Sequence, residues 1–532
     1  MPKNKSSEKH FAVKIYTTAL EYDYSLPWNA PTIERWTGSG FVIDGKRIVT
    51  NAHVAGGAIF LEVQLANDSI RYPAKLKAVS HECDLAEIEV DSEEFWEKTT
   101  ALKIGETPHQ KQKVEVHGFP IGGEGYCITD GIVSRLENDV YVHGGQMLLS
   151  TQVSAPINPG NSGGAVISDG EVVGVVHQGI NSSQSIGYMI PASVLKHFLV
   201  QVETNNNGFP SLAIETQTME NPYLRERYKM HEHHSGVLVR DVPDISCAKG
   251  KLQEEDVLLA INGIAIWNDG TVHIDPMKRV DYRYLINNAK IGDEMVFKIL
   301  RDGNKIIEKV QLTNSLGRSS IIQPRAYGIA PSYYIIAGAI VVQPVSKNFM
   351  YDNKKTYANK PKVHPSDQLV AINTILKSRY TQGYDNFGGE LIVKVNNKSI
   401  NNLQELIMAT EENKEKLHIV ETQSGKIVVI PNLSKTVSDE ILEAYHIKES
   451  SSQDLAPLVK SSDNYLAAVL PFTPLLLSKS KAAPTTVAEG YKPVFAPCLS
   501  KALKKERQDE LVVAEQERHQ QQRKTLTHGI VS

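Results

Sequence analysis

The stretch INPGNSGGAVISDGEVVGVVH, residues 157–177, sets Ser162 among three glycines and a proline, and a β-like apolar run follows it. Glycine adopts backbone angles that are closed to other residues and lets another chain approach closely. Two interpretations are open. The stretch is either a tight turn with a bystander serine, or a backbone that presents N–H groups and one nucleophile to the same atom.

Two Asp-Gly dipeptides predict β-hairpins near this serine and near a histidine. One turn, at Asp169-Gly170, follows soon after Ser162. The other, at Asp44-Gly45 in GFVIDGKRIVTNAH (40–53), lies in a hairpin that ends just before His53. Asp-Gly favours the type I′ turn, whose twist matches that of the flanking strands.

Short β-like runs with closely spaced turn signals fill residues 11–200, a pattern typical of a sandwich or barrel. Residues 208–313 combine strands with the helical segment YRYLINNA, and residues 326–432 repeat this plan more loosely. Beyond about residue 436, loop-like and highly charged segments with little apolar face predict partial disorder.

Bulk composition excludes several classes of protein. A chain of 532 residues is too long for one core and predicts three or four domains. The net charge of −4 gives no basic surplus for nucleic acid, and the four cysteines show no CxxC spacing for zinc. No apolar run approaches the roughly 20 residues that span a bilayer. The N-terminus lacks the apolar core of a secretory signal, so a cytoplasmic location is expected.

Three residues have the types needed for amide hydrolysis by serine. The serine needs a base, the base needs a carboxylate to fix its tautomer, and the oxyanion needs preorganised N–H donors. Ser162, His53 and Asp84 supply the side chains, and the N–H groups of Gly160 and Ser162 are natural oxyanion donors. His53 is one of 17 histidines, and Asp84 alone could be an ordinary strand-end residue. Together they occur in the order His, Asp, Ser, the chymotrypsin-type order rather than that of subtilisins or α/β-hydrolases.

Six segments together resemble the HtrA/Deg family of serine proteases. They are similar above all to the plant-type Deg proteases, which carry a PDZ domain and a degenerate second PDZ. The segments are TGSGFVIDGKRIVTNAHV (37–54), HECDLA (81–86), GFPIGG (118–123), TDGIVSR (129–135), INPGNSGGAV (157–166) and IGYMIP (186–191).

The resemblance implies a mainly β fold, with a chymotrypsin-like double β-barrel protease domain followed by two PDZ-like α+β domains. The expected parts are an N-terminal arm (1–10), a trypsin-like protease domain (11–203), PDZ domain 1 (208–315), a degenerate PDZ-like domain 2 (326–433) and a C-terminal extension (436–532). The implied activity is ATP-independent cleavage of unfolded or damaged proteins, with no cofactor and no metal.

The resemblance also assigns site residues. His53 would be the general base, Asp84 its orienting carboxylate and Ser162 the nucleophile, with Gly160, Asn161 and Ser162 forming the oxyanion loop. The primary pocket would be walled by Ile186, Gly187 and Tyr188, which include no acidic residue to hold a Lys or Arg side chain. In FPSLAIETQ (209–217), the loop and strand that bind a peptide's C-terminal carboxylate would be Ser211, Leu212, Ala213 and Ile214.

Partners follow from the same resemblance: unfolded proteins, peptides with apolar C-termini, and other copies of the chain in a trimer-based homo-oligomer. Aromatic candidates for a trimer contact, or for burial in their own barrel, are Tyr16, Tyr22, Tyr24 and Trp28. Two residues depart from the family pattern: Ala165 stands where proline usually follows Gly-Gly, and Glu87 occupies an often apolar position. The run HEHH (231–234) lacks the one-face spacing of a helical metal site and predicts a solvated loop.

Two other functions stay open from the sequence. A binding or chaperone scaffold on a protease fold would have little or no turnover. An esterase is disfavoured by the order of the three residues.

Overall fold

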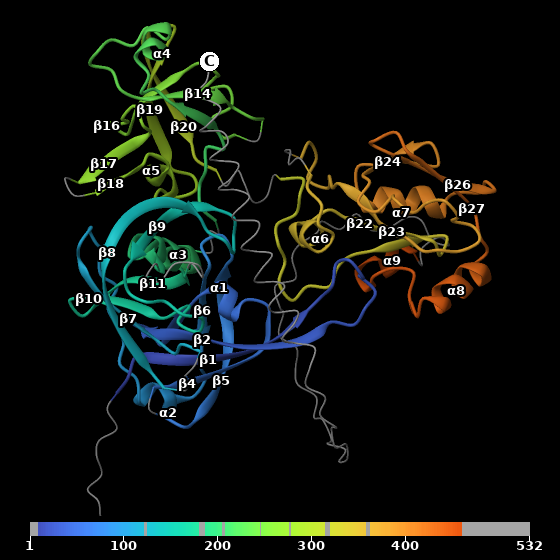
Figure 1. Ribbon diagram of the computed structural model, residues 1–532, viewed down its shortest axis with the longest axis horizontal. Helices are drawn as coiled ribbons and strands as arrows, with labels where there is room; N and C mark the ends of the chain where they lie inside the picture. The colour runs from blue at the N-terminus through green and yellow to red at the C-terminus, as the bar shows by residue number, and fades with distance from the viewer. Residues whose placement is uncertain are drawn as a thin grey trace, which may run out of the picture. The chain divides into compact units, whose positions relative to one another are not determined.

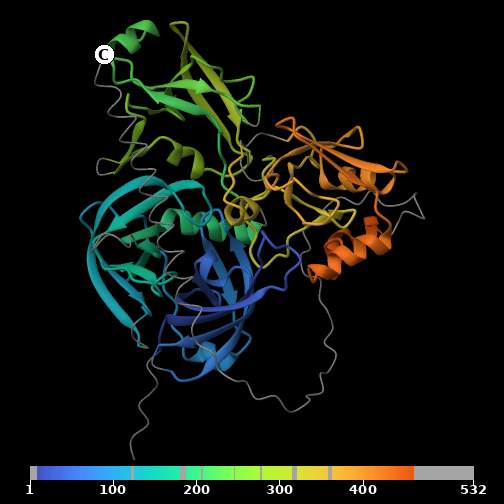
Figure 2. The ribbon, with the colours of Figure 1, turned by 45° about the vertical axis from the view of Figure 1, so that its right-hand side comes forward.

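The computed structural model describes residues 9–66, 68–121, 125–179, 187–204, 208–244, 246–275, 278–313, 320–357 and 362–459. Figures 1 and 2 show two closed barrels side by side, the first in blue and the second in cyan and green.

The first barrel closes six strands in the order β1-β2-β3-β6-β5-β4. Along β1, buried Val13, Ile15 and Thr17 alternate with more exposed residues, as a strand with one face on a core requires. The elements are β1 (Ala12–Glu21), β2 (Thr32–Ile43), β3 (Arg47–Thr50), α1 (Ala52–Ala55), β4 (Ala58–Leu65), β5 (Arg71–Ser80), β6 (Leu85–Glu89) and α2 (Glu93–Glu97).

The second barrel repeats the six-stranded plan in the order β10-β11-β12-β9-β8-β7 and is followed by a helix. Its elements are β7 (Lys113–Gly118), β8 (Cys127–Val140), β9 (Met147–Val153), β10 (Ala165–Ser168), β11 (Glu171–Gly179), β12 (Gly187–Pro191) and α3 (Ala192–Thr204).

The two predicted hairpins form, but their turns differ. At the second hairpin, Asp169 and Gly170 have φ of 50° and 81°, the left-handed pair of a type I′ turn. At the first, Ile43 pairs with Arg47, and the positive φ angles fall on Gly45 and Lys46 instead. The first loop therefore has one residue more than the predicted two-residue turn.

One apolar cluster joins the barrels. It includes Phe41 and Leu85 from the first barrel and Val175 and Ile190 from the second, all fully buried. Because the barrels share this core, the loops at their junction are held in fixed register with one another.

The second unit is a mixed α and β structure with a sheet in the order β13-β14-β15-β19-β20, in which β13 is an edge strand. Its elements are β13 (Glu215–Thr218), α4 (Pro222–Arg227), β14 (Val237–Asp241), β15 (Val257–Ile261), β16 (Ile264–Ala265), β17 (Thr271–Asp275), β18 (Lys278–Asp281), α5 (Arg283–Asn287), β19 (Glu294–Arg301) and β20 (Asn304–Gln311).

The third unit contains a three-stranded sheet, β21-β22-β23, and a four-stranded sheet, β25-β24-β26-β27. Its elements are β21 (Tyr334–Ile336), β22 (Ile340–Pro344), α6 (Lys347–Asp352), β23 (Val370–Ile375), β24 (Ile392–Val395), β25 (Lys398–Ser399), α7 (Leu403–Glu411), β26 (Leu417–Thr422), β27 (Ile427–Pro431), α8 (Lys435–Ala444), η1 (Gln453–Leu455) and α9 (Ala456–Val459).

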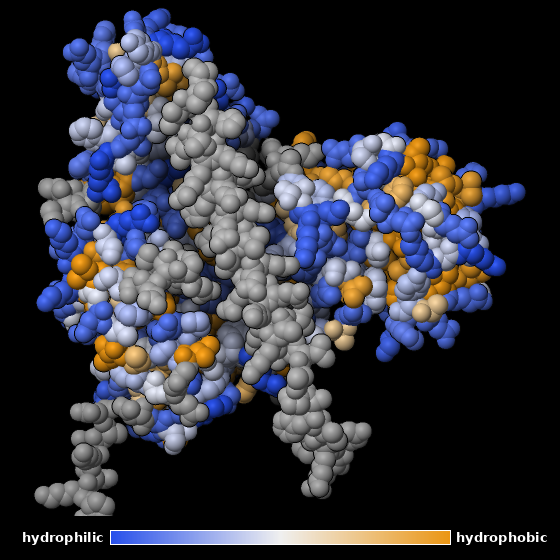
Figure 3. All heavy atoms as spheres, viewed as in Figure 1, coloured by the Kyte–Doolittle hydropathy of each residue, from blue (hydrophilic) through white to orange (hydrophobic). Residues whose placement is uncertain are grey.

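The predicted C-terminal extension begins inside this folded structure. Ile441 and Leu442 of α8 and Leu455 of η1 are buried in clusters of the third unit, so ordered packing continues as far as α9. In Figure 3, orange side chains interrupt the hydrophilic surface of this unit, where Val393 and Ile427 are among the exposed apolar residues.

The predicted fold class is confirmed. The chain is mainly β, with two closed barrels followed by α+β structure.

Candidate active site

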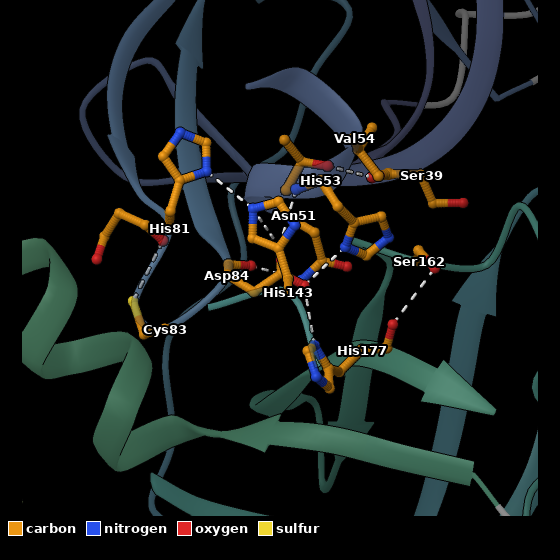
Figure 4. Close-up of polar contacts among 12 residues, drawn as sticks. Ser39, Asn51, His53, Val54, His81, Cys83, Asp84, His143, Ser162 and His177 are labelled. Carbon is orange, nitrogen blue, oxygen red and sulfur yellow. Dashed lines mark hydrogen bonds and ion pairs between the residues drawn. The ribbon is translucent and has the colours of Figure 1, made fainter. Parts of the chain in front are cut away.

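The candidate triad comes from three loops at the barrel junction. His53 lies in the one-turn helix α1 after β3, Asp84 in the turn before β6, and Ser162 in the glycine-rich loop before β10 (Figure 4). Asp84 has a φ of 52°, a left-handed conformation that aspartate and asparagine tolerate better than most residues. The Asp84 side chain is 0% exposed.

His53 and Asp84 are joined by two contacts. Nδ1 of His53 lies 2.6 Å from Oδ2 of Asp84, and the backbone N–H of His53 donates a 2.8 Å hydrogen bond to Oδ1. The carboxylate thereby fixes both the position and the tautomer of the imidazole, and leaves Nε2 as the basic nitrogen.

The electrostatics of the pair follow from burial and mutual attraction. Burial by itself raises the pKa of Asp84, but the nearby imidazoles of His53 and His177 outweigh burial and hold that pKa well below its ordinary value. Burial lowers the pKa of His53, but the charge of Asp84 and the hydrogen bond to it outweigh burial, so the pKa of His53 is raised. Asp84 is therefore ionised at neutral pH, and His53 binds its proton more tightly than a free imidazole.

The hydroxyl of Ser162 is directed away from His53. Its Oγ donates a 3.4 Å hydrogen bond to the carbonyl oxygen of His177 (Figure 4). Within the described residues, no hydrogen bond joins Ser162 to His53. Catalytic hydrogen bonds are often long or misaligned before substrate binds, so this geometry is compatible with a nucleophile at rest.

The oxyanion loop holds its backbone in a conformation that requires glycine. Gly160 has a φ of 98°, and a Cβ there would lie 2.5 Å from the carbonyl oxygen of Phe119. The Pro159 carbonyl accepts a 2.7 Å bond from the Ile121 N–H, so the Gly160 N–H of the same trans peptide points the other way. Among the described residues this N–H has no acceptor, whereas the N–H of Asn161 donates to Asn158. Gly160 is therefore better placed than Asn161 to donate to an oxyanion.

Ser39 of β2 joins this loop to the first barrel. Its hydroxyl donates a 2.7 Å hydrogen bond to the carbonyl of Gly160 and accepts one from the N–H of Phe119 at 2.8 Å. Its own N–H donates to the carbonyl of Ser162 at 2.9 Å. Ser39 was not predicted as a site residue, although it lies in the motif TGSG.

The predicted pocket residues are only partly described. Ile186 lies outside the described residues. Gly187 faces the side chain of Ile157, which a Cβ at Gly187 would approach to 2.3 Å. Tyr188 is buried, with its hydroxyl 3.4 Å from a guanidinium nitrogen of Arg135.

The predicted carboxylate-binding residues lie in the loop that leads into the edge strand β13. The N–H of Ser211 donates to the carbonyl of Thr313 at 3.3 Å, and the N–H of Ala213 donates to the Ser211 hydroxyl at 3.1 Å. Leu212 is buried, and Ile214 packs against the apolar core. Among the described residues β13 has a strand partner on one side only, and two of the four loop amides already have acceptors within the chain.

The aromatic candidates for a trimer contact have partners within the chain. Tyr24 packs with Ile322 and Phe349, with Tyr22 beside it, and its N–H donates to Asp352 at 2.8 Å. Trp28 packs in the cluster that contains Ile441 and Leu442. The ring of Tyr16 lies 3.7 Å from the Arg71 guanidinium on its own barrel.

The two departures from the family pattern are both buried. Ala165 packs in the core that joins the barrels. Glu87 is fully buried on β6, with the ammonium nitrogen of Lys77 at 2.8 Å from its carboxylate. Neither residue touches the contact between His53 and Asp84.

Three histidines near Asp84 were missed by sequence reasoning, in addition to Ser39. His177 brings Nδ1 to 2.9 Å from Oδ2 of Asp84, His143 brings Nε2 to 4.0 Å from Oδ1, and His81 contacts His143 at 2.8 Å. Burial lowers the pKa of His143 to about 3 and that of His81 to about 4, so both are neutral at physiological pH. His143 and His177 meet Asp84 only in the folded chain, whereas His81 lies three residues before Asp84 in HECDLA and contacts His143.

The histidine run predicted to form a solvated loop is only partly exposed. The HEHH run follows α4, with His231 and His233 exposed and His234 buried. The described part of the chain brings no three His, Cys, Asp or Glu side chains together for a metal ion. Nor does any helix in that part have the length and apolar character needed to cross a bilayer.

Comparisons with known proteins agree with the architecture. A trypsin-like peptidase domain matches residues 38–175, and a PDZ domain matches residues 322–454. The PDZ match thus falls on the unit whose sequence pattern looks the more degenerate. Among solved structures, an HtrA-type protease AlgW with tripeptide is 24% identical, with 58% of this chain and 95% of that chain covered and a TM-score of 0.45.

Two plant proteases are similar in sequence to this chain over most of its length. Protease Do-like 4, mitochondrial, from Arabidopsis thaliana is 35% identical over 448 residues, which is 83% of this chain and 85% of that protein. Protease Do-like 2, chloroplastic, from the same plant is 34% identical over 465 residues, 83% of this chain and 75% of that protein.

These names contradict the expected cytoplasmic location, since the relatives are mitochondrial or chloroplastic. The expectation was wrong because it rested on an absent apolar signal core, whereas organelle-targeting segments are amphipathic. In its sequence and in its double-barrel and PDZ architecture, the chain belongs to the Do-like branch of the HtrA/Deg serine proteases.

Proposed function

We propose that this protease cleaves unfolded or damaged proteins without ATP. Ser162 acts as the nucleophile, His53 as the general base and Asp84 as the carboxylate that orients it. The observation that carries the assignment is the double contact between Asp84 and His53, because it sets the tautomer in which Nε2 can take a proton from serine. The Gly160 and Ser162 N–H groups would stabilise the oxyanion.

The test is hydrolysis of casein by wild type and by Ser162→Ala, together with labelling by a fluorophosphonate. We expect Ser162→Ala to lose nearly all turnover and all labelling while it keeps its fold. The matched control is Ser69→Ala, an exposed serine outside the site, which should behave as wild type. More than a few per cent of activity in Ser162→Ala would overturn the assignment.

The same experiment addresses the alternative of a binding scaffold on a protease fold. The rotation of the Ser162 hydroxyl toward His177 is the observation that favours this alternative. Absence of fluorophosphonate labelling in wild type, in every assembly state that can be isolated, would support the scaffold and refute the enzyme.

Peptide binding by the second unit is proposed for chains that end in an apolar residue with a free carboxylate. The support is the open edge of β13 and the loop at Ser211–Ile214 that precedes it. Amidation of the peptide's C-terminus should weaken binding in calorimetry, because amide donors would lose the charged acceptor. Equal affinity for free and amidated peptides would exclude this mode.

A trimer-based homo-oligomer is also proposed, with activity that rises when a substrate or peptide shifts the oxyanion loop. The contacts that Tyr24 and Trp28 make within the chain direct the search for the trimer contact to other residues. Light scattering gives the mass, and turnover against substrate concentration gives the cooperativity. A monomer with hyperbolic kinetics and no response to apolar C-terminal peptides would refute this proposal.

A further inference from the structure

The carboxylate of Asp84 has two imidazole neighbours at one oxygen. Nδ1 of His53 lies 2.6 Å from Oδ2, and Nδ1 of His177 lies 2.9 Å from the same atom. Figure 4 shows both rings directed at the carboxylate, His53 from the first barrel and His177 from the second. A serine mechanism requires only the first of these contacts.

His177 sits at a position that touches both ends of the candidate triad. It lies on β11 and is 3% exposed, with its ring centroid 4.8 Å from that of the buried Tyr141. Its side chain lies beside Asp84, while its backbone carbonyl accepts a hydrogen bond from the Ser162 hydroxyl. A change in the ring therefore acts on the carboxylate while the main-chain contact to serine remains.

Among the described residues, neither nitrogen of the buried His177 imidazole has a partner that meets hydrogen-bond geometry. A buried polar group without a partner lowers the stability of the fold by roughly 1–3 kcal/mol. A histidine with no role in the site would therefore destabilise the protein at this position. The nearest compensating group is the Asp84 carboxylate, whose negative charge lies 2.9 Å from Nδ1 even though the angle falls short of hydrogen-bond geometry.

Four titratable groups beside Asp84 and His177 carry no charge near neutral pH, and the other charged groups that act on these four are Glu82, Asp139 and Arg325. Burial lowers the pKa values of His143 and His81 to about 3 and about 4. Burial raises the pKa of Cys83 to about 12 and that of Tyr141 well above its ordinary value. Among the charged groups in the described part of the chain, Asp84 is the one that contacts both His53 and His177, so the two imidazoles share its charge.

We propose that His177 is a positioning residue that holds the Asp84 carboxylate as a second imidazole partner, beside His53. The inference rests on the proposed function of the triad. By attracting part of the carboxylate charge, His177 limits how strongly Asp84 stabilises the protonated form of His53. His53 then remains a free base to a lower pH than it would beside an unshared carboxylate.

The test uses two variants that differ in one donor. His177→Phe keeps a ring of similar size and removes both nitrogens. His177→Asn keeps an amide nitrogen where Nδ1 stands. The measurement is the pH dependence of the rate constant for inactivation by a fluorophosphonate, which reports the free enzyme's base. Burst titration of active sites corrects for any misfolded fraction.

We expect the acid limb of His177→Phe to move to higher pH by about half to one unit, and its rate at neutral pH to fall roughly three- to tenfold. The limb of His177→Asn should stay near that of wild type. If His177→Phe does not accumulate as folded protein, His177→Leu serves as a second variant without a donor.

Coincident acid limbs in all three proteins would overturn the inference, whatever happens to the maximal rate. A limb of His177→Asn that moves as far as that of His177→Phe would also overturn it, because the donor would then not be the cause. If wild type is not labelled at Ser162, the proposed function itself fails. If wild type is labelled and the limbs coincide, only the role of His177 is refuted.

Discussion

The ring of Tyr327 stacks on the ring of His143, with 4.4 Å between the centroids and 21° between the planes. Tyr327 stacks in the same way on His81, and its hydroxyl lies 3.0 Å from Nδ1 of His143. Tyr327 precedes β21, in the segment that enters the third unit. One tyrosine outside the barrels therefore covers the two neutral histidines beside the Asp84 loop.

Removal of this ring should weaken both the fold and the site. We expect Tyr327→Ala to lower stability by about 1–3 kcal/mol and to reduce kcat/KM several-fold, because two stacking contacts and the hydroxyl's polar contacts with His143 are lost. Tyr327→Phe keeps the stacking and should lose only about 1 kcal/mol. Thermal unfolding and casein hydrolysis measure the two effects. The control is Tyr223→Ala, at a tyrosine that is 77% exposed. An alanine variant at Tyr327 that matches this control would contradict the prediction.

The pH dependence of the enzyme should follow the raised pKa of His53. Because catalysis needs the neutral imidazole, activity is lost as pH falls through this pKa. Since Asp84 raises the pKa, the loss should occur above the ordinary histidine value of about 6.5. A profile of kcat/KM against pH in constant ionic strength measures the limb. A midpoint below the ordinary value would show that burial outweighs Asp84.

Two alanine variants separate the effect of the Gly160 conformation on catalysis from the general strain of placing alanine at a left-handed glycine. Gly160→Ala should lower kcat by about 100-fold or more, because the new Cβ collides with the loop that presents the oxyanion donor. Gly170→Ala shares the left-handed conformation, with a φ of 81°, but its Cβ meets no atom within 4 Å. It should cost only about 1 kcal/mol of stability and leave kcat unchanged. Kinetics normalised to titrated active sites give the comparison, and equal kcat values in the two variants would refute the oxyanion role.

The role of Asp84 is best tested with asparagine. Asparagine tolerates the left-handed backbone of this position, so Asp84→Asn should fold as wild type. Its amide cannot hold His53 in the productive tautomer, and kcat should fall by about 10⁴-fold. Circular dichroism checks the fold, and single-turnover hydrolysis measures the rate. Retention of a tenth or so of wild-type kcat would be incompatible with an orienting carboxylate.

Cleavage should favour small or medium aliphatic residues before the scissile bond. The described part of the predicted pocket includes Gly187 against Ile157 and no acidic side chain of its own, so a Lys or Arg side chain would find no charge partner there. Mass spectrometry of peptides from a digested proteome gives the profile. A profile dominated by Lys or Arg would refute the assignment of this pocket.

The sequence predicted the fold well because its signals are local. Asp-Gly turns and alternating apolar runs mark the strands, although closure into barrels came from the resemblance and not from periodicity. The meeting of His53 with Asp84 followed from the motif order. His177, His143 and Tyr327 escaped notice because each reaches the site through tertiary packing across a long stretch of chain. The extra residue in the first hairpin escaped because turn length depends on strand register.

The hydrogen bonds of Ser39 make the shape of the predicted oxyanion loop depend on the docking of the two barrels. The oxyanion segment is hydrogen-bonded through Gly160 and Ser162 to a strand of the opposite barrel, so neither barrel alone contains all of the bonds that shape it. Separation of the barrels would therefore break these hydrogen bonds and abolish hydrolysis, even while each barrel keeps its own sheet. The Ser39 N–H should exchange with solvent only when the interface between the barrels opens as one cooperative unit. Its protection against exchange would then report the fraction of molecules in which the loop is correctly formed.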